Sequence, residues 1–360
     1  MMGLGKVLVI IDGPDPDNYI LALAASSQLL DMDVVAVIMT GRPVSAVHGQ
    51  PPYGFNPHAS RAVRRDNALH VKGIFMRHGR EHIPVFEGLR APFSTVPHKF
   101  HIHERVTDVY DDAHAGHQLA GDIDDAVAYL AGLEGSIHVI CGGPMTDLAY
   151  LMQQLLLSGK LGLVTAQLGM FGFGGVKTIA GGRRQFNALA DPTAAHLVLQ
   201  EYPGPFYLLP TDITKDPAHG FDHPDELAAL LRSTAGTEVV EMYRAAWPIM
   251  WEPRGERIFV HDFHPAELMH HLLRQQAARH EQRQFGRYRV SPVGIAHVPH
   301  LVHEQDRWGE IDLGPPDPSM PPRFLVDGVD TSGHRIALAT SIDSAPYPSE
   351  AHHGATTVAN

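Results

Sequence analysis

The stretch Val7-Leu-Val-Ile-Ile-Asp-Gly-Pro-Asp-Pro-Asp-Asn18 decides the fold of this chain. Its first five residues are all apolar, a pattern typical of a strand that is buried on both faces. The next seven hold three carboxylates and an amide: Asp12, Asp15, Asp17 and Asn18. Residues 19–30 are rich in Ala and Leu and predict a helix, and residues 34–39 predict a second strand. This order indicates a parallel βαβ unit with a right-handed crossover.

The alternation of strands and helices continues through most of the chain. Residues 43–120 are rich in His, Pro and Arg, and we predict only a strand at 83–86 there. Further on, strands are predicted at 137–141, 161–168 and 206–209. Helices are predicted at 122–133, after the loop 142–147 and through 157, at 190–200, and over most of 224–284 with an interruption near 248–257. The sequence therefore predicts an α/β fold, a mostly parallel central sheet with helices on both faces. We expect one catalytic domain over residues 1–345 and a disordered tail at 346–360.

Composition excludes several classes of partner. The 360 residues carry 40 acidic and 28 basic side chains, a formal charge of −12 that argues against binding a nucleic-acid backbone. No apolar run approaches the length of a membrane span, so we expect no membrane partner. Cys141 is the single cysteine, which excludes an intrachain disulfide, and we predict that it is buried in a strand. These features favour a cytoplasmic protein.

The acidic loop after the first strand is the strongest candidate site. Ligands of open α/β sheets bind at the carboxyl ends of strands, where this loop lies. Three carboxylates within six residues repel one another unless a cation or solvent screens them. Hard oxygen ligands at this density favour Ca²⁺ or Mg²⁺ over zinc. A solvated acidic turn is the alternative, because Asp, Pro and Gly are also turn formers.

Five motifs, in the right order, resemble the inosine–uridine-preferring nucleoside hydrolase family. The acidic loop resembles that family's Asp-rich first motif. The others are Gly143-Pro-Met-Thr-Asp-Leu-Ala149, Gln185-Phe-Asn187 before Asp191-Pro-Thr-Ala-Ala195, Leu209-Pro-Thr-Asp-Ile-Thr214, and His261-Asp262. No single motif is specific, but the set is. The resemblance covers roughly residues 6–275 and implies an N-ribohydrolase that releases a free base and a sugar.

The resemblance also implies roles for individual residues. It implies that Ca²⁺, preferred here over Mg²⁺, activates the water that attacks the anomeric carbon of a ribose. Asp17 matches the general base, and His261 lies where some members place the acid that protonates the leaving base. The metal ligands implied are Asp12, Asp15, Asn18, the carbonyl of Thr146, and Asp262. The substrate-binding residues implied are Asn187 at a ribose hydroxyl, with Gln185, Phe186, Arg42 and Arg184. Family members are commonly dimers or tetramers, so a homo-oligomer is expected.

Several positions depart from the family pattern. The acidic loop is one residue shorter, Asn18 stands in place of an Asp ligand, and Arg42 in place of an Asn. The Glu that holds the 5′ end of the ribose is here Gln185, preceded by Arg183 and Arg184, with Lys177 in the same loop. An amide does not repel an anion and Arg can grip phosphate bidentately, so the substrate is either a nucleoside or a 5′-substituted relative such as a nucleotide. In the alternative, Gln185 simply binds the usual 5′-hydroxyl.

Other interpretations stay open at this stage. The chain could be a non-catalytic nucleoside-binding relative that has lost its metal, or an acidic-loop phosphohydrolase that uses Mg²⁺ and Asp12 as nucleophile. Asp191 is interpreted as a helix cap, and His261 could be structural. Tyr243, Trp247 and Trp251 share a helical face that is either core or base pocket, and His114 and His117 are either surface residues or part of that pocket.

Overall fold

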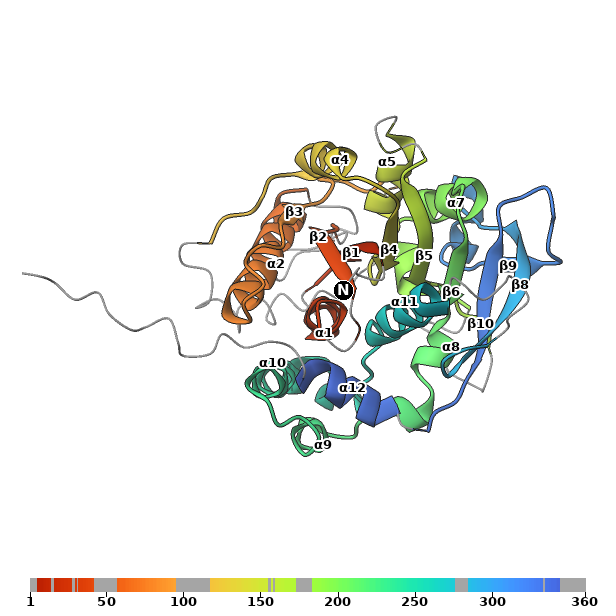
Figure 1. Ribbon diagram of the computed structural model, residues 1–360. Coiled ribbons are helices and arrows are strands. Elements are labelled where there is room, and N and C mark those ends of the chain that lie inside the picture. The colour runs from red at the N-terminus through yellow and green to blue at the C-terminus, as the bar shows by residue number, and fades with distance from the viewer. Residues whose placement is uncertain are drawn as a thin grey trace, which may run out of the picture.

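The computed structural model describes residues 5–13, 16–27, 30, 32–41, 57–94, 117–154, 157, 159–172, 183–275, 284–332 and 334–343. Among these residues, ten strands form one sheet in the order β3-β2-β1-β4-β5-β6-β10-β8-β7, with β9 paired to β8 (Figure 1). The strands are β1 (Lys6–Ile11), β2 (Asp33–Met39), β3 (Val85–Glu87), β4 (Ile137–Cys141), β5 (Leu161–Gln167), β6 (Phe206–Leu209), β7 (Gln284–Phe285), β8 (Tyr288–His297), β9 (Asp312–Gly314) and β10 (Arg323–Val329). Neighbours from β3 to β10 pair in parallel, and β7, β8 and β9 add antiparallel pairs. The predicted mostly parallel sheet is confirmed.

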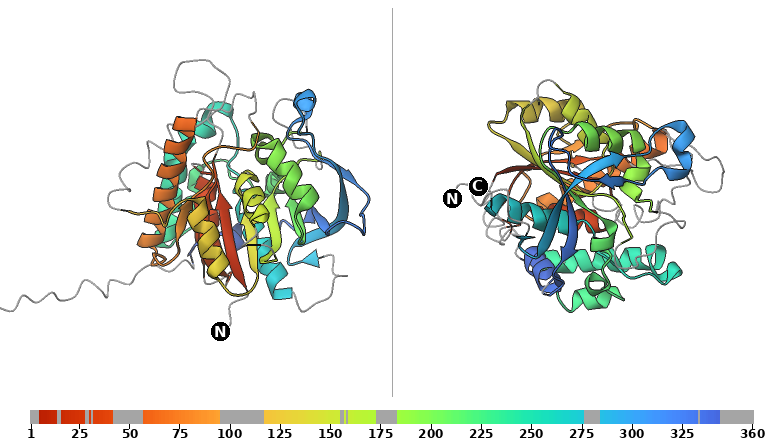
Figure 2. Two further views of the ribbon diagram at one scale, coloured as in Figure 1. Left: turned by 90° about the horizontal axis from the view of Figure 1, so that it is seen from above. Right: turned by 90° about the vertical axis from the view of Figure 1, so that its right-hand side faces the viewer.

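Helices cover both faces of this sheet, and β1 lies between the two layers (Figure 2). One layer contains α1 (Pro16–Ala25), α2 (Pro57–Arg77), α10 (Thr234–Met250), α11 (Phe263–Gln275) and α12 (His334–Asp343). The other contains α4 (Ile123–Gly132), α5 (Thr146–Gln153) and α7 (Pro192–Glu201). Val7 and Val9 pack in the first layer and Leu8 and Ile10 in the second, all fully buried. Burial on both faces explains why β1 is apolar at every position.

Several short helices and turns complete the described structure. They are α6 (Phe186–Ala190), α8 (Thr211–Thr214), α9 (Pro224–Ala228), and the 3-10 turns η5 (Pro217–His219), η6 (Glu252–Arg254) and η7 (Val302–Arg307). Cys141 is buried at the end of β4, as predicted. None of the described helices is long and apolar enough to cross a membrane. The predicted tail, residues 346–360, lies outside the described residues.

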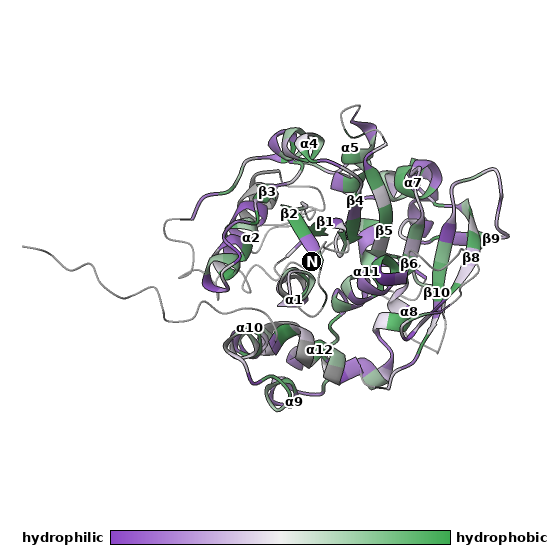
Figure 3. Cartoon of the chain, in the orientation of Figure 1, coloured by the Kyte–Doolittle hydropathy of each residue, from purple (hydrophilic) through white to green (hydrophobic). Residues whose placement is uncertain are grey.

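Among the described residues, α2 and α12 are the longer helices that the sequence did not predict, and the short helices α6 and α8 were not predicted either. Figure 3 shows that α2 carries hydrophilic and hydrophobic residues side by side. Ala68, Val71 and Phe75 face the core at helical spacing, but the Arg and His residues among them hide this pattern. The other longer helix that was missed is α12.

The predicted interruption near 248–257 is confirmed. The helix α10 continues through Pro248 in its last turn and ends at Met250, and α11 begins at Phe263.

Arg323 provides a test of how β10 is fixed to the α7 layer. Its buried guanidinium donates to the carbonyls of Leu199 (2.9 Å), Tyr202 (2.7 Å) and Gly204 (3.1 Å). Arg323→Leu leaves these carbonyls without their donor, so we expect the free energy of unfolding, measured by urea denaturation, to fall by about 3 kcal/mol. Arg289→Leu, which removes a largely exposed pair with Asp327, should cost less than about 1 kcal/mol. Equal losses in the two variants would contradict this account.

Candidate active site

The candidate site lies where β2, β1 and β4 end side by side. The backbone N–H of Thr40 donates to the Ile11 carbonyl (2.7 Å), and that of Gly142 donates to the Ile10 carbonyl (2.9 Å). Ligands of parallel sheets bind at this edge. A Cβ on Gly142 would lie 2.8 Å from Cγ of Asp262, and one on Gly143 would lie 2.9 Å from Cβ of Asp12. Two adjacent glycines thus allow carboxylates from β1 and from the start of α11 to approach the same turn.

Asp17 and Thr146 lie at the beginnings of two helices, next to the Gly142–Gly143 turn. Asp17 lies in the first turn of α1 and is buried, where the helix dipole favours an ionised carboxylate. Thr146 is the first residue of α5, and its hydroxyl donates to Asp191 Oδ2 (2.8 Å). Asp15, Arg42, Lys177 and His114 lie outside the described residues, as does the side chain of Asn18.

Asp191 caps α7, which confirms the interpretation from the sequence. Its carboxylate accepts hydrogen bonds from the backbone N–H groups of Ala194 (3.2 Å), Phe93 (2.7 Å) and Ser94 (3.1 Å). The hydroxyls of Thr146 and Ser94 also donate to it, at 2.8 and 2.9 Å. Burial nevertheless raises the pKa of this carboxyl above its usual range. Five donors hold Asp191 in place and tie α5, α7 and the segment after β3 together.

Asp147 is a buried carboxyl that the sequence reasoning missed. Its Oδ1 accepts from the backbone N–H of Leu89 (2.6 Å), and the Thr40 side chain also favours its charged form. Burial raises the pKa of Asp147 to about 6, although the Arg64 charge opposes this shift. Arg64 itself forms a buried ion pair with Glu87 (2.7 Å). The place of Asp147 in the Thr-Asp-Leu motif was the signal that could have identified it. The Arg64–Glu87 pair could not be predicted, because Arg64 lies on α2, a helix that the sequence did not predict.

An amide network lies beside Gly142. Nδ2 of Asn187 donates to the carbonyls of Gly142 and Gln167 and to Oε1 of Gln167, each at 2.9 Å. Nε2 of Gln185 donates to the same Oε1 (2.6 Å), and Oε1 of Gln185 caps α6 at Ala188 N (3.0 Å). Nε2 of Gln167 donates to Thr211 Oγ1 (3.2 Å). Gln167 was not predicted as a site residue. Its place as the last residue of β5 could have identified it, because ligands bind at the carboxyl ends of strands.

The remaining predicted side chains surround this network. Arg184 donates to the carbonyl of Asp306 in η7, and Arg183 pairs with Asp312 (3.2 Å). Phe186 packs in a small cluster with Leu189, Ala190 and Trp308. His261 shares a hydrogen bond with Thr214 Oγ1 (2.7 Å), and burial lowers the pKa of its imidazole to about 3.

The aromatic stripe on α10 belongs to the core. Tyr243 is fully buried, and Trp247 and Trp251 pack against the same cluster. The Tyr243 and Trp251 ring centroids lie 5.5 Å apart, and the two Trp rings 6.4 Å apart. His117, half-buried, lies against Gly73 of α2.

An α/β sheet with buried carboxylates at its carboxyl edge is typical of α/β proteins that bind their ligands there, and comparison with known proteins identifies the family. The chain belongs to the inosine-uridine preferring nucleoside hydrolases, whose family model matches residues 58–313. It is therefore an N-ribohydrolase, which hydrolyses an N-glycosidic bond. The matched range begins after the acidic loop, the part of the chain that departs from the family in length. No curated protein matches the chain.

Solved structures share the fold at low sequence identity. A plant nucleoside hydrolase has 17% identity and a TM-score of 0.66, covering 94% of this chain and 99% of its own. A purine-preferring ribonucleoside hydrolase from Gardnerella vaginalis has 13% identity and a TM-score of 0.63, covering 94% and 98%. The type III effector protein XopQ, complexed with adenosine diphosphate ribose, has 13% identity and a TM-score of 0.61, covering 96% and 94%.

Substitutions of Asp191 and Asp216 test how much the Asp191 cap stabilises the protein. Both are N-caps followed by Pro, but Asp216 caps the short turn η5 through one bond to Ala218 N. Because Asp191 gathers five donors in a buried position, Asp191→Ala should lower the free energy of unfolding by about 3 kcal/mol or more. Asp216→Ala should cost about 1 kcal/mol or less. The assignment fails if chemical denaturation shows the same loss for both.

Proposed function

We propose that this N-ribohydrolase depends on Ca²⁺ and that its substrate is a ribonucleoside or a 5′-substituted relative. The observation that carries the proposal is the pair of carboxylates, Asp12 and Asp262, packed against adjacent glycines beside Thr146. The base of the reaction is Asp17, in the first turn of α1.

The donor set at this edge fits a hard cation. Asp12 and Asp262 are both almost fully buried, and two buried carboxylates on one turn favour a positive ion between them. The proposed ligands are oxygens of Asp12, Asp15, Asn18, Asp262 and the Thr146 carbonyl. Ca²⁺ accepts many oxygen ligands in flexible geometry, whereas Mg²⁺ keeps several waters, so this set favours Ca²⁺. When bound, the ion would lower the pKa of a coordinated water.

The side chains of the site supply the remaining chemistry. Asp17 accepts a proton from the attacking water while the water oxygen bonds to the anomeric carbon and the N-glycosidic bond breaks. The ribosyl group gains positive charge in this transition state, which neighbouring carboxylates stabilise. The electron pair of the broken bond stays on the base. His261 is the proposed proton donor to that base, and because burial lowers its pKa to about 3, it donates from the N–H of a neutral ring. Asn187 binds a ribose hydroxyl.

Gln185 is the basis for proposing a 5′-substituted substrate. As an amide it can donate to Gln167 Oε1, which a carboxylate cannot do, and it brings no negative charge toward the 5′ end. Arg183 and Arg184 precede it, and their present partners belong to η7 and β9. XopQ, of similar fold, is described in complex with adenosine diphosphate ribose, whose ribose carries a 5′ substituent.

Two further expectations complete the proposal. The protein is a cytoplasmic homo-oligomer, a dimer or tetramer, which light scattering of the purified chain can measure. The competing interpretation is a relative that binds nucleosides without turnover because the short loop has lost its metal. Ca²⁺ that co-purifies or rebinds stoichiometrically would exclude that interpretation.

Asp17→Asn tests the general base. The amide cannot accept the proton, so turnover of the best nucleoside or nucleotide should fall about 10²–10⁴-fold. Calorimetry should show Ca²⁺ still binding, because Asp17 is not among the proposed ligands. Asp124→Asn, on the exposed first turn of α4, is the control and should keep full activity. An Asp17→Asn enzyme that keeps half of the parent rate would contradict the assignment of Asp17 as the general base.

The 5′ preference is tested with a panel of nucleosides, their 5′-monophosphates and ADP-ribose. We expect kcat/KM to be at least about tenfold higher for a 5′-phosphorylated substrate than for the plain nucleoside. In Arg184→Ala, kcat/KM for the 5′-phosphorylated substrate alone should fall about tenfold, because one charged contact is lost. Arg289→Ala, at the largely exposed second residue of β8, where Arg289 pairs with Asp327, is the control. A tenfold preference for the plain nucleoside, with Arg184→Ala changing neither rate, would show that the 5′-hydroxyl is free.

A further inference from the structure

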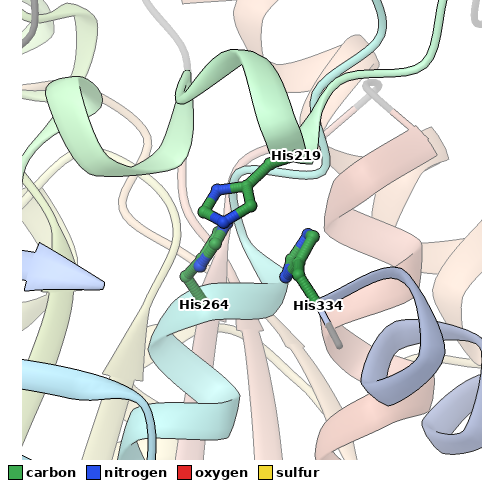
Figure 4. Close-up of side chains that lie close together, drawn as sticks. All are labelled: His219, His264 and His334. Atoms are coloured by element: carbon green, nitrogen blue, oxygen red, sulfur yellow. The ribbon is translucent and has the colours of Figure 1, made fainter. Parts of the chain in front are cut away.

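Three buried histidines lie close together near the start of α11. His219 ends η5, His264 lies in the first turn of α11, and His334 begins α12 (Figure 4). Their candidate ligand nitrogens all lie within 4.8 Å of one another. The ring centroids are 4.1–4.7 Å apart. Three elements distant in sequence therefore bring imidazoles together inside the protein.

The two nitrogens of each ring have different surroundings. Nδ1 of His219 contacts the Ile213 carbonyl (3.2 Å), Nδ1 of His264 contacts the Tyr288 hydroxyl (3.0 Å), and Nδ1 of His334 contacts Nη2 of Arg287 (2.5 Å). Nε2 of each ring is buried and has no hydrogen-bond partner among the described atoms. A buried polar atom without a partner is costly, and three of them in one place indicate a missing shared ligand.

The partners of Nδ1 fix the proton on two of the rings. A carbonyl only accepts, so His219 carries its proton on Nδ1 and a lone pair on Nε2. Nδ1 of His264 lies 3.0 Å from the Tyr288 hydroxyl and 3.5 Å from Nη2 of Arg287. The nearer Tyr288 hydroxyl donates to Glu267 Oε2 (2.7 Å), so its oxygen accepts from Nδ1 of His264, and the lone pair lies on Nε2 there too. A ligating histidine typically donates its other N–H to a carbonyl or to a group held by a carboxylate, as both rings do here.

His334 is the ring that must rearrange. Arg287 can only donate, so Nδ1 of His334 accepts and its Nε2 carries the proton in this arrangement. Rotation of the His334 ring away from Arg287 would present a nitrogen lone pair to the other two histidines instead. Arg287 does not depend on this contact, because Glu267 binds its guanidinium at 2.6 and 2.9 Å and offsets its charge.

We propose that His219, His264 and His334 form a second metal site, for Zn²⁺ or a similar borderline transition metal, separate from the carboxylate site. Imidazole nitrogen suits such ions, whereas Ca²⁺ prefers oxygen. Zinc binds nitrogen at about 2.0–2.1 Å in tetrahedral geometry, which places three nitrogens about 3.4 Å apart. Small side-chain movements close this distance, and water supplies the fourth ligand.

Burial favours the neutral rings that such a site needs. It lowers the pKa of His219 to about 4, so the imidazole keeps its lone pair at neutral pH. The ion would join α12, the last described helix, to η5 and to the start of α11. His261 and Asp262 immediately precede that helix. The site thus fixes the C-terminal helix against the segment that carries part of the active site.

Metal binding to the full chain tests the proposal. The protein is dialysed against EGTA and a zinc chelator and then loaded with Zn²⁺ or Co²⁺. We expect one equivalent retained after gel filtration, a rise in Tm of several degrees, and with Co²⁺ the visible absorption of a tetrahedral nitrogen site. No retained metal and no rise in Tm in the parent protein would overturn the proposal.

Variants separate this site from other histidines and from the carboxylate site. His219→Gln and His334→Ala should each weaken zinc retention at least tenfold and abolish the rise in Tm. His223→Ala, on an exposed residue near His219, should bind zinc as the parent does. Asp12→Asn should also keep zinc while losing activity, which distinguishes a failure of this proposal from a failure of the Ca²⁺ site. Unchanged zinc retention in both His219→Gln and His334→Ala would refute it.

Discussion

The burial of several carboxylates at one edge of the sheet is the constraint on which the rest of the structure depends. Asp12, Asp17, Asp147, Asp191 and Asp262 are all buried where β1, β4 and their following helices meet. Charge removed from water must be compensated by hydrogen bonds, by opposite charge or by protonation. Each carboxylate in this group uses a different combination, and the combination indicates its role.

Asp191 and Asp147 show the structural solutions. Asp191 accepts from five donors and connects three segments, so its function is to hold the site together. Asp147 has one backbone donor, and the Arg64 charge opposes the pKa shift that burial imposes. Asp12 and Asp262 lie instead against Gly143 and Gly142, where the absence of a Cβ lets both side chains approach the same turn closely. This arrangement suits carboxylates that share a cation.

The start of α11 separates two chemically different environments. Asp262 is one of the proposed oxygen ligands of Ca²⁺, and two residues later His264 joins two more imidazoles. Oxygen donors select hard cations and imidazole nitrogens select borderline ones, so the two environments do not compete for the same metal. Arg287, Tyr288 and Glu267 form a hydrogen-bonded group that orients His264 from behind. Sequence spacing alone does not reveal this second set.

The sequence by itself determined the elements whose pattern is local. The unbroken apolar run before Asp12 could only be a doubly buried strand, and the strand–loop–helix order set the parallel sheet and placed the acidic loop at its functional edge. The family motifs are short enough to be read along the chain. Tertiary structure decided everything that depends on long-range contact: the Arg64–Glu87 pair on an unpredicted helix, the Gln167 bridge between Gln185 and Asn187, and the meeting of His219, His264 and His334. The reason is physical. These partners lie 18 to 115 residues apart in the sequence, and the packing of the layers brings them together, which no local periodicity encodes.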